Sequence, residues 1–365
     1  MIMKIKEIFT ALMLLVGVCA FAQDAGKRTF VEASELTLVG KLFPDTPVPY
    51  HRVDTVIHKG FTPYENQQVR MSSGISVSFR TNSGSISVKA DYGQTRSTRS
   101  STYLTARGFD LYIKVDGKWQ WAGVNSPKND NSLSKNIYLV KDMSEGWKEC
   151  LLYLPNFSEI LSLKIGVDAG ASIEKCDIPF KGRVGMFGSS FTHGSSTSRP
   201  GMTWPAQLSR MTGYQFLSLG CGGNSKLQPY FAEALADADV DVFVFDAFSN
   251  PKPELIEERL FDFIDIIRKK HPETPLIFLK SIYRSRARFN VQLDEADKVK
   301  AEMAEKMIRE AQKRYDNIYW IDTTNPLSDK LETSVDGTHP SDYGYYLMAE
   351  SVCRPLTKIL KKYIK

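Results

Sequence analysis

The second half of the chain alternates short apolar runs with amphipathic segments, and this alternation constrains the fold more than any other feature of the sequence. The expected strands are Arg183–Phe187, Tyr214–Leu219, Val240–Phe245, Leu276–Leu279 and Ile318–Ile321. Apolar residues at helical spacing follow in two of the intervening segments, Ile256, Leu260, Phe263 and Ile267 in one, and Val299, Met303, Met307 and Ala311 in the other. Nearly continuous apolar strands are typical of a parallel sheet covered on both faces. We therefore predict that residues 179–365 form a flavodoxin-like, doubly wound α/β sheet, with ligands at the carboxyl ends of its strands.

The preceding part of the chain instead alternates apolar and polar residues, as strands with one buried face do. Two such runs, Ile75–Phe79 and Ile86–Ala90, are joined by a polar turn. The pair Asp116-Gly117 lies between two further runs and predicts a hairpin, because a type I′ turn needs two residues with positive φ. Many short strands separated by turns indicate that residues 25–178 form a β-sandwich of the jelly-roll type. We expect Trp119 and Trp121 to pack in its core rather than to form a platform for sugars.

Residues 1–22 have the features of an export leader. A basic start is followed by an apolar stretch, Ile8–Val18, that is too short for a membrane span of about 20 residues, and then by a cleavage signal, Ala20-Phe21-Ala22. We therefore expect a periplasmic or extracellular protein with no integral membrane span. Lipoprotein anchoring at Cys19 is less favoured, because bulky Val18 stands where a small residue is wanted.

Charge and cysteine content exclude several classes of function. The formal net charge of +5 is small for 365 residues, and no basic stripe alternates with aromatic residues, so the sequence indicates no nucleic-acid partner. After the leader the cysteines are Cys150, Cys176, Cys221 and Cys353, and their spacing matches no metal-binding signature. Free thiols are favoured over a Cys150–Cys176 disulfide, which export would allow, and neither a metal nor a cofactor is predicted.

A stretch rich in glycine and serine, Gly188–Gly194, follows the first expected strand and precedes an expected helix around Trp204–Leu208. A tight turn between a strand and a helix presents a hydroxyl at the carboxyl edge of the sheet and points backbone N–H groups toward it. A nucleophile that forms an oxyanion needs both features, which makes Ser190 a candidate nucleophile. Alone, the stretch would suit a surface loop equally well.

The loops after the next two strands contain uncharged hydrogen-bond donors. The second loop is Gly220–Ser225 and the third is Asp246–Asn250. Glycine N–H groups and an asparagine amide are donor types that stabilise a developing oxyanion. The alternatives are a plain tight turn for the glycines and a helix N-cap ahead of Pro251 for Asn250.

Asp336 and His339 lie three residues apart in a loop before an expected C-terminal helix, Tyr345–Leu356. At this spacing the carboxylate can accept the Nδ1–H of the imidazole and leave Nε2 to take a proton from a serine. Histidine titrates near neutral pH, which suits a general base. We therefore predict that this loop supplies the base and the residue that orients it.

Other titratable residues compete for these roles. His193 lies three residues after Ser190 and is expected to touch substrate or cap the helix, not to act as the base. Asp322 ends the fifth strand and is expected to cap the following loop. His51 and His58 are expected to be ordinary surface or loop residues.

Together these residues resemble the ordered sequence blocks of the SGNH (GDSL) hydrolase superfamily. The matching positions are Gly188–Thr192 for the first block, Gly223 for the second, Asn250 for the third and Asp336–Pro340 for the fifth. The resemblance covers residues 180–365. The stretch Gly108–Tyr112 also resembles the Gly-x-Asp-Leu-Tyr mark of a β-domain that precedes one branch of the superfamily.

The resemblance implies that Ser190 is the nucleophile, His339 the base and Asp336 its orienting residue. It also implies that the oxyanion hole consists of the Ser190 N–H, the Gly223 N–H and the Asn250 side chain. The sequence departs from the family pattern at Ser189, where the family often has aspartate, and in the third block, which keeps only its asparagine.

With the leader and the β-domain, the resemblance implies an exported serine esterase that removes short acyl groups, acetyl foremost, from carbohydrates through an acyl-enzyme. The expected partner is a small-molecule or polysaccharide acyl ester. The alternatives are acyl transfer by the same triad and a carbohydrate-binding protein with an inert hydrolase domain. A long-chain lipase is less favoured, because no lid-like apolar segment is found.

Several basic or aromatic side chains lie on loops that could reach the mouth of such a site: Arg199, Tyr283, Arg284, Arg286 and Arg288. A solvated basic surface is the favoured interpretation. If these residues line the site instead, an acidic glycan would fit it.

Overall fold

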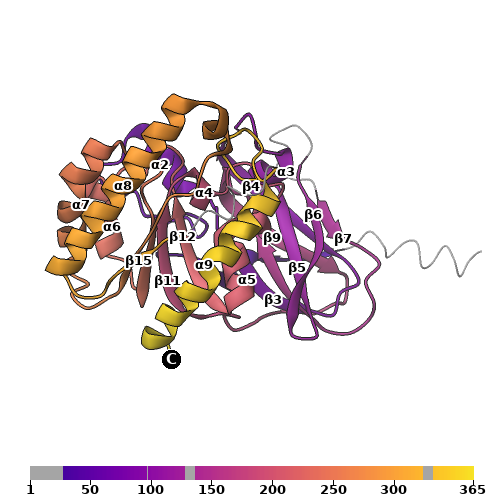
Figure 1. Ribbon diagram of the computed structural model, residues 1–365. Helices are drawn as coiled ribbons and strands as arrows, with labels where there is room; N and C mark the ends of the chain where they lie inside the picture. Colours follow the sequence, from indigo (N-terminus) through magenta and orange to yellow (C-terminus); the bar gives the residue numbers. More distant parts are fainter. Residues whose placement is uncertain (1–27, 97, 128–135, 324–331) are drawn as a thin grey trace, which may run out of the picture.

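The computed structural model describes residues 28–96, 98–127, 136–323 and 332–365 (Figure 1). The expected leader, residues 1–22, lies outside them. None of the helices in these four ranges combines the length and the apolar character that crossing a bilayer requires.

The first part of the chain forms two antiparallel sheets that face each other. One contains, in order, β1 (Arg28–Glu32), β9 (Ser158–Asp168), β4 (Ile86–Thr95) and β7 (Ile137–Val140). The other contains β10 (Ile173–Lys175), β3 (Ser76–Thr81), β8 (Lys148–Tyr153), β5 (Phe109–Val115) and β6 (Lys118–Asn125), with β2 (Thr37–Val39) also paired to β3. Between the strands lie η1 (Ala33–Glu35), α2 (Pro63–Arg70) and α3 (Tyr103–Arg107). Apolar side chains from both sheets, such as Val77, Phe79, Val88 and Ile165, are fully buried between them.

The alternating runs are strands as predicted, but the turn between β3 and β4 does not make a hairpin. The two strands belong to different sheets, so the polar turn carries the chain across the sandwich. The predicted hairpin at Asp116-Gly117 does form, with φ of 49° and 74° at the two turn residues and with β5 paired to β6.

The second part of the chain forms a five-stranded parallel sheet in the order β12 (Tyr214–Gly220), β11 (Lys181–Gly188), β13 (Val242–Asp246), β14 (Leu276–Leu279) and β15 (Ile318–Ile321). The helices of this part are α4 (Ser190–His193), η2 (Pro200–Met202), α5 (Trp204–Thr212), α6 (Pro229–Ala236), α7 (Pro253–Arg268), η3 (Ser285–Phe289), α8 (Val291–Arg314) and α9 (Asp342–Tyr363). Helices α5 and α9 cover one face of the sheet, and α6, α7 and α8 cover the other (Figure 1). The prediction of a doubly wound parallel sheet preceded by a β-sandwich is confirmed.

One of the two predicted apolar stripes does not match the buried face of its helix. All four stripe residues of α7 are buried. In α8, however, Val299 is 42% exposed, and the buried residues begin at Ala304. The first half of α8 therefore runs clear of the core, and its apolar residues do not mark a buried face.

A buried ion pair joins the two parts of the chain. Asp110, in β5, is fully buried and accepts hydrogen bonds from Arg199 Nη1 (2.7 Å), the Gly201 N–H (2.8 Å) and Trp121 Nε1 (3.0 Å). Burial raises the pKa of Asp110, and the charge of Arg199 opposes this shift. Because Arg199 follows the predicted nucleophile turn, this ion pair anchors that segment to the sandwich.

The same contacts correct two expectations from the sequence. Arg199 packs at the joint between the two parts and is not a residue of the site mouth. Trp121 is 53% exposed, with the Arg199 guanidinium over its ring, so it belongs to the joint rather than to the sandwich core.

Replacing Asp110 by alanine should lower the free energy of unfolding by roughly 3 kcal/mol, because it leaves Arg199 without its buried partner. Denaturant unfolding of the two proteins measures the difference. Glu174→Gln, which removes the exposed partner of Arg80, is the matched control and should change stability by less than about 1 kcal/mol. Equal losses in both variants would contradict a structural role for the buried pair.

Candidate active site

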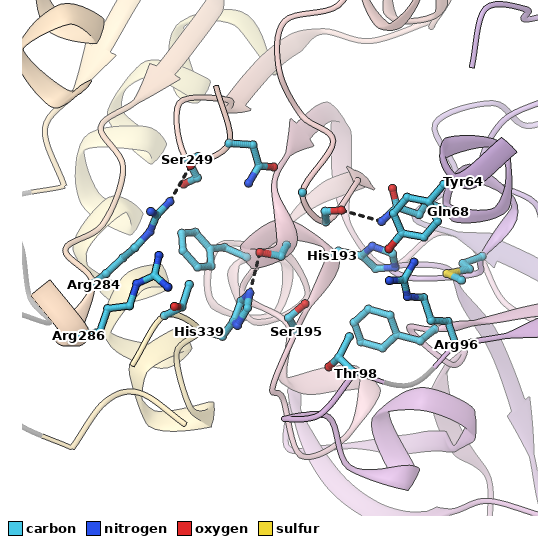
Figure 2. Close-up of a pocket in the computed structure, with 18 of the residues that line it drawn as sticks. Tyr64, Gln68, Arg96, Thr98, His193, Ser195, Ser249, Arg284, Arg286 and His339 are labelled. Carbon is cyan, nitrogen blue, oxygen red and sulfur yellow. Dashed lines mark hydrogen bonds between the residues drawn. The ribbon is translucent and has the colours of Figure 1, made fainter. Parts of the chain in front are cut away.

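The predicted nucleophile and base meet at the carboxyl edge of the parallel sheet (Figure 2). Ser190 is the first residue of α4, directly after β11, and its Oγ lies 3.0 Å from His339 Nε2. His339 Nδ1 lies 2.8 Å from Asp336 Oδ2. If Asp336 accepts the Nδ1–H, Nε2 is left to accept the proton of the Ser190 hydroxyl.

The loop of Asp336 is built to keep this carboxylate ionised. Its Oδ1 accepts the backbone N–H groups of Thr338 (2.9 Å) and His339 (2.8 Å). Burial favours a higher pKa, but the His339 ring and these two N–H groups outweigh it and lower the pKa of Asp336 to about 2. The carboxylate is therefore an anion at neutral pH and holds the imidazole in one orientation.

A second carboxylate, Asp246, holds the nucleophile turn. Its Oδ2 accepts the Ser189 N–H (3.2 Å), the Ser189 hydroxyl (2.8 Å) and the Thr192 hydroxyl (2.9 Å). Gly188 allows this close packing, because a Cβ there would lie 2.2 Å from Thr192 Oγ1. Burial raises the pKa of Asp246 to about 6, against the lowering effect of the hydrogen bonds from Ser189 and Thr192. This role of Asp246 was not predicted from the sequence, although a carboxylate at the end of the strand next to β11 was a usable signal.

The three predicted oxyanion donors line the same cavity as His339. Among the described residues, no acceptor takes the N–H of Ser190 or of Gly223. Gly223 has φ of 76°, a conformation that favours glycine. The Asn250 carbonyl oxygen accepts the Ser225 N–H at 3.3 Å, which directs the other end of its amide away from that contact. These groups are available to a developing negative charge.

The sandwich domain supports the second loop of this site. Gln68, in α2, donates from Nε2 to the Gly222 carbonyl (2.9 Å) and accepts from the Asn224 amide (2.7 Å). Arg52 is fully buried and donates to the Gly220 carbonyl (2.9 Å) and to two carbonyls of its own domain. Burial lowers the pKa of Arg52 to about 10. Neither residue was predicted from the sequence, because nothing local to Arg52 or Gln68 indicates a contact more than 150 residues away.

The site opens into a cavity of about 460 Å³ between the two parts of the chain. The sandwich side contributes Tyr64, Gln68, Met71, Arg96, Thr98 and Phe157, several of which are labelled in Figure 2. Of the predicted mouth residues, Arg284 and Arg286 line this cavity. In the described part of the chain, no group of three His, Cys, Asp or Glu side chains is placed to hold a metal ion, and Cys150, Cys176, Cys221 and Cys353 form no disulfide.

The competing residues lie in other environments. His193 is buried, donates from Nε2 to the Asn156 carbonyl (2.9 Å) and stacks on Phe157. Burial and the charge of Arg52 hold the pKa of His193 well below its ordinary value, so it is neutral and packs the floor of the cavity. Asp322 pairs with Lys280 (3.0 Å).

The expectation that His51 and His58 are ordinary surface or loop residues is corrected in part. His51 is buried, with its Nε2 2.9 Å from Glu159 Oε1, so it is no surface residue. His58 lies in a loop, 3.9 Å from Asp237.

Comparison with known proteins finds two family models along the chain. The GDSL-like lipase/acylhydrolase family matches residues 181–357, and a domain described as the N-terminus of SGNH-hydrolase-type esterases, GxDLY, matches residues 28–173. No curated protein matches the sequence.

Solved structures show the same two-part arrangement. A crystal structure described as a GDSL-like lipase from Bacteroides ovatus is 40% identical, with 93% of this chain and 99% of that chain covered and a TM-score of 0.88. The salicylyl-acyltransferase SsfX3 from a tetracycline biosynthetic pathway is 22% identical, with 91% and 97% covered and a TM-score of 0.71. A family two carbohydrate esterase from Clostridium thermocellum, in complex with cellohexaose, is 14% identical, with 79% and 93% covered and a TM-score of 0.55. The last two likenesses show the fold alone.

The raised pKa of Asp246 predicts a dependence of stability on pH, which tests whether this carboxyl group is buried. Its contribution to stability is complete below its ordinary pKa of 3.8 and is lost as the pH rises through about 6. Between pH 4.5 and 7, the wild type should therefore lose roughly 2 kcal/mol more unfolding free energy than Asp246→Asn, which has no group to ionise. Denaturant unfolding of both proteins at the two pH values measures this, and parallel pH profiles would contradict the assignment.

Proposed function

This chain belongs to the GDSL-like lipase/acylhydrolase family, and from that premise we propose that it is a serine esterase with Ser190 as nucleophile, His339 as general base and Asp336 as the orienting anion. The observation that carries the proposal is the continuous hydrogen-bonded chain from Ser190 Oγ through the His339 ring to Asp336, at 3.0 and 2.8 Å. Nucleophile and base within hydrogen-bond reach, with the base held by a third group, are the minimum that acyl transfer to a serine requires.

In the first half-reaction, His339 Nε2 takes the Ser190 hydroxyl proton while Oγ attacks the ester carbonyl carbon. The carbonyl oxygen becomes an oxyanion, which the N–H groups of Ser190 and Gly223 and the Asn250 amide stabilise. The intermediate then breaks its bond to the alcohol oxygen, which takes the proton from Nε2 and leaves as an alcohol. Ser190 remains acylated.

In the second half-reaction, water replaces the alcohol and the same proton transfers release the acid. The side chain of His339 is 23% exposed and that of Asp336 is 36% exposed, so solvent reaches the base directly. This accessibility favours hydrolysis over transfer to an alcohol acceptor, which works best where water is excluded.

For the substrate, we propose short acyl groups, acetyl foremost, on carbohydrates outside the cytoplasm. The small residues Gly222, Gly223 and Ser249 line the cavity, and a Cβ at Gly222 would lie 3.3 Å from Ser190 Cβ, which supports a short acyl group. The likeness in fold to a carbohydrate esterase that binds cellohexaose supports a sugar as the alcohol part. Export rests on the leader pattern of residues 1–22.

Ser190→Ala should abolish turnover of 4-nitrophenyl acetate, with a loss of about 10⁴-fold or more in kcat, because no other group supplies the nucleophile. Asp336→Asn should cost about 10³–10⁴-fold, since an amide cannot hold the imidazole in the required tautomer. An organophosphate should label wild-type Ser190 and leave Ser190→Ala unlabelled. An inert hydrolase domain on a carbohydrate-binding protein predicts the opposite, namely equal rates and no labelling, with circular dichroism showing that both variants are folded.

Acyl length tests the small polar wall of the cavity. The kcat/KM for 4-nitrophenyl acetate should exceed that for 4-nitrophenyl octanoate by about tenfold or more, because each methylene of the longer chain gains little burial here. Gly222→Ala provides a matched perturbation of this wall, since its Cβ would lie 3.3 Å from Ser190 Cβ. A preference for octanoate in the wild type would point to a lipase and contradict the proposed substrate.

A further inference from the structure

The catalytic cavity is lined by positive charge. Four of its lining residues, Arg96, Arg284, Arg286 and Lys300, are cationic, and no aspartate or glutamate is among the described residues that line it. A concave wall with one sign of charge concentrates ligands of the other sign. The question is whether these cations are used within the protein or are available to a substrate.

Two of the four have structural partners. Arg284 donates to the Ser249 carbonyl (2.6 Å) and to Asp297 (3.3 Å), and Lys300 reaches the same carbonyl (3.4 Å) and the same carboxylate (3.8 Å). These contacts hold the loop that carries Asn250. The single carboxylate of Asp297 thus contacts two cations, Arg284 and Lys300, and the three side chains together keep a net positive charge.

The guanidinium groups of the other two, Arg96 and Arg286, make no ion pair within the described part of the chain. No described residue hydrogen-bonds or pairs with the side chain of Arg96 or Arg286, and both residues are exposed. The Arg96 guanidinium lies over the ring of Tyr64, 4.0 Å from its centre, and the Arg286 backbone N–H donates to the Gly337 carbonyl (2.9 Å). The ring of Tyr64 therefore orients the Arg96 side chain, the backbone of Arg286 is fixed beside Gly337, and both residues stay exposed to solvent.

These cations lie on opposite sides of the catalytic pair. Figure 2 shows Arg284 and Arg286 on the side of His339 and Ser249, and Arg96 on the side of Tyr64 and Gln68. Burial, together with the charges of Arg284 and Arg286, lowers the pKa of Lys300, so the positive charges are close enough to oppose one another. Such crowding is relieved when an anion binds among them.

The position of Arg286 indicates which part of the ester it meets. The leaving alcohol oxygen must lie within reach of His339 Nε2 to take its proton, so the alcohol part of the substrate lies on the His339 side. The backbone N–H of Arg286 is hydrogen-bonded to the carbonyl of Gly337, two residues before His339. Arg286 therefore faces the alcohol part rather than the acyl part.

We propose that the alcohol part of the substrate is an acidic sugar, whose carboxylate or sulfate is bound by Arg286 next to the scissile ester, with Arg96 binding a second anionic group on the other side of the nucleophile. This inference rests on the proposed esterase function and defines its substrate class. Arginine suits the role because its planar fork binds either oxyanion with two hydrogen bonds.

The test uses one polymer in two charge states. Acetylated polygalacturonate with free carboxylates is compared with the same material after methyl esterification, and acetate release gives kcat/KM for each. The wild type should prefer the free acid by about tenfold or more, the gain of roughly one charge-assisted hydrogen bond. Raising NaCl from 0.05 to 0.5 M should reduce that preference, because the interaction is screened.

Substitutions at single arginines identify which residue produces the preference for the free-acid polymer. Arg286→Gln should lower the ratio of the two kcat/KM values by about tenfold, Arg96→Gln should lower it less, and Arg286→Lys should keep part of it. Arg288→Gln removes a charge from the same helix η3 at a residue that does not line the cavity, and should leave the ratio unchanged. An acetylated sulfated galactan in the same assay distinguishes sulfate from carboxylate recognition.

Three results would overturn the inference. They are equal rates on the free and esterified polymers, an unchanged ratio in Arg286→Gln, and a preference for 4-nitrophenyl hemisuccinate over the acetate, which would place the recognised charge on the acyl part. Failure of the esterase proposal is distinct, because the wild type would then release no acetate from either polymer and turn over no 4-nitrophenyl ester.

Discussion

The hydrogen bond between Ser190 and His339 joins loops that are 149 residues apart, and much of the structure serves to keep its two ends in place. A different carboxylate secures each end. Asp246 is buried under the nucleophile turn, and burial raises its pKa to about 6. Asp336 is partly exposed, and three hydrogen bonds lower its pKa to about 2 despite the opposing effect of burial. The first group therefore acts mainly as a hydrogen-bond acceptor that shapes the turn, while the second supplies a permanent charge beside the imidazole.

The β-sandwich contributes residues to the cavity and supports one of the loops of the site. Gln68 and Arg52 hold the loop of Gly222 and Gly223, and Asp110 anchors the segment after the nucleophile helix through Arg199. The carbonyls that Gln68 and Arg52 bind belong to the loop whose N–H must meet the oxyanion, so removal of the sandwich would free that loop. The aspartate of the Gly-x-Asp-Leu-Tyr stretch thus has a physical role, since it carries the buried charge of the joint between the two parts.

Features set by local sequence were predictable, and features set by distant pairing were not. The strands of the parallel sheet and the loops of Ser190 and His339 follow from apolar runs and from the rule that parallel strands end at one edge. The separation of β3 and β4 into two sheets, and the pairing of His51 with Glu159, depend on partners that no local pattern marks. The place of Arg199 was not predictable for the same reason. An arginine in a loop is expected to be solvated, and only the fold brings it to the buried Asp110.

The positive cavity has a consequence for catalysis as well as for binding. Each nucleophilic attack leaves an imidazolium at His339, and the charges of Arg284 and Arg286, which line the same cavity, oppose it, whereas Asp336 at 2.8 Å favours it. An anion bound by Arg286 would neutralise one of these opposing charges when the imidazolium forms. An acidic sugar would then contribute through kcat as well as KM, because its charge stabilises the transition state more than the bound ground state, in which His339 is neutral.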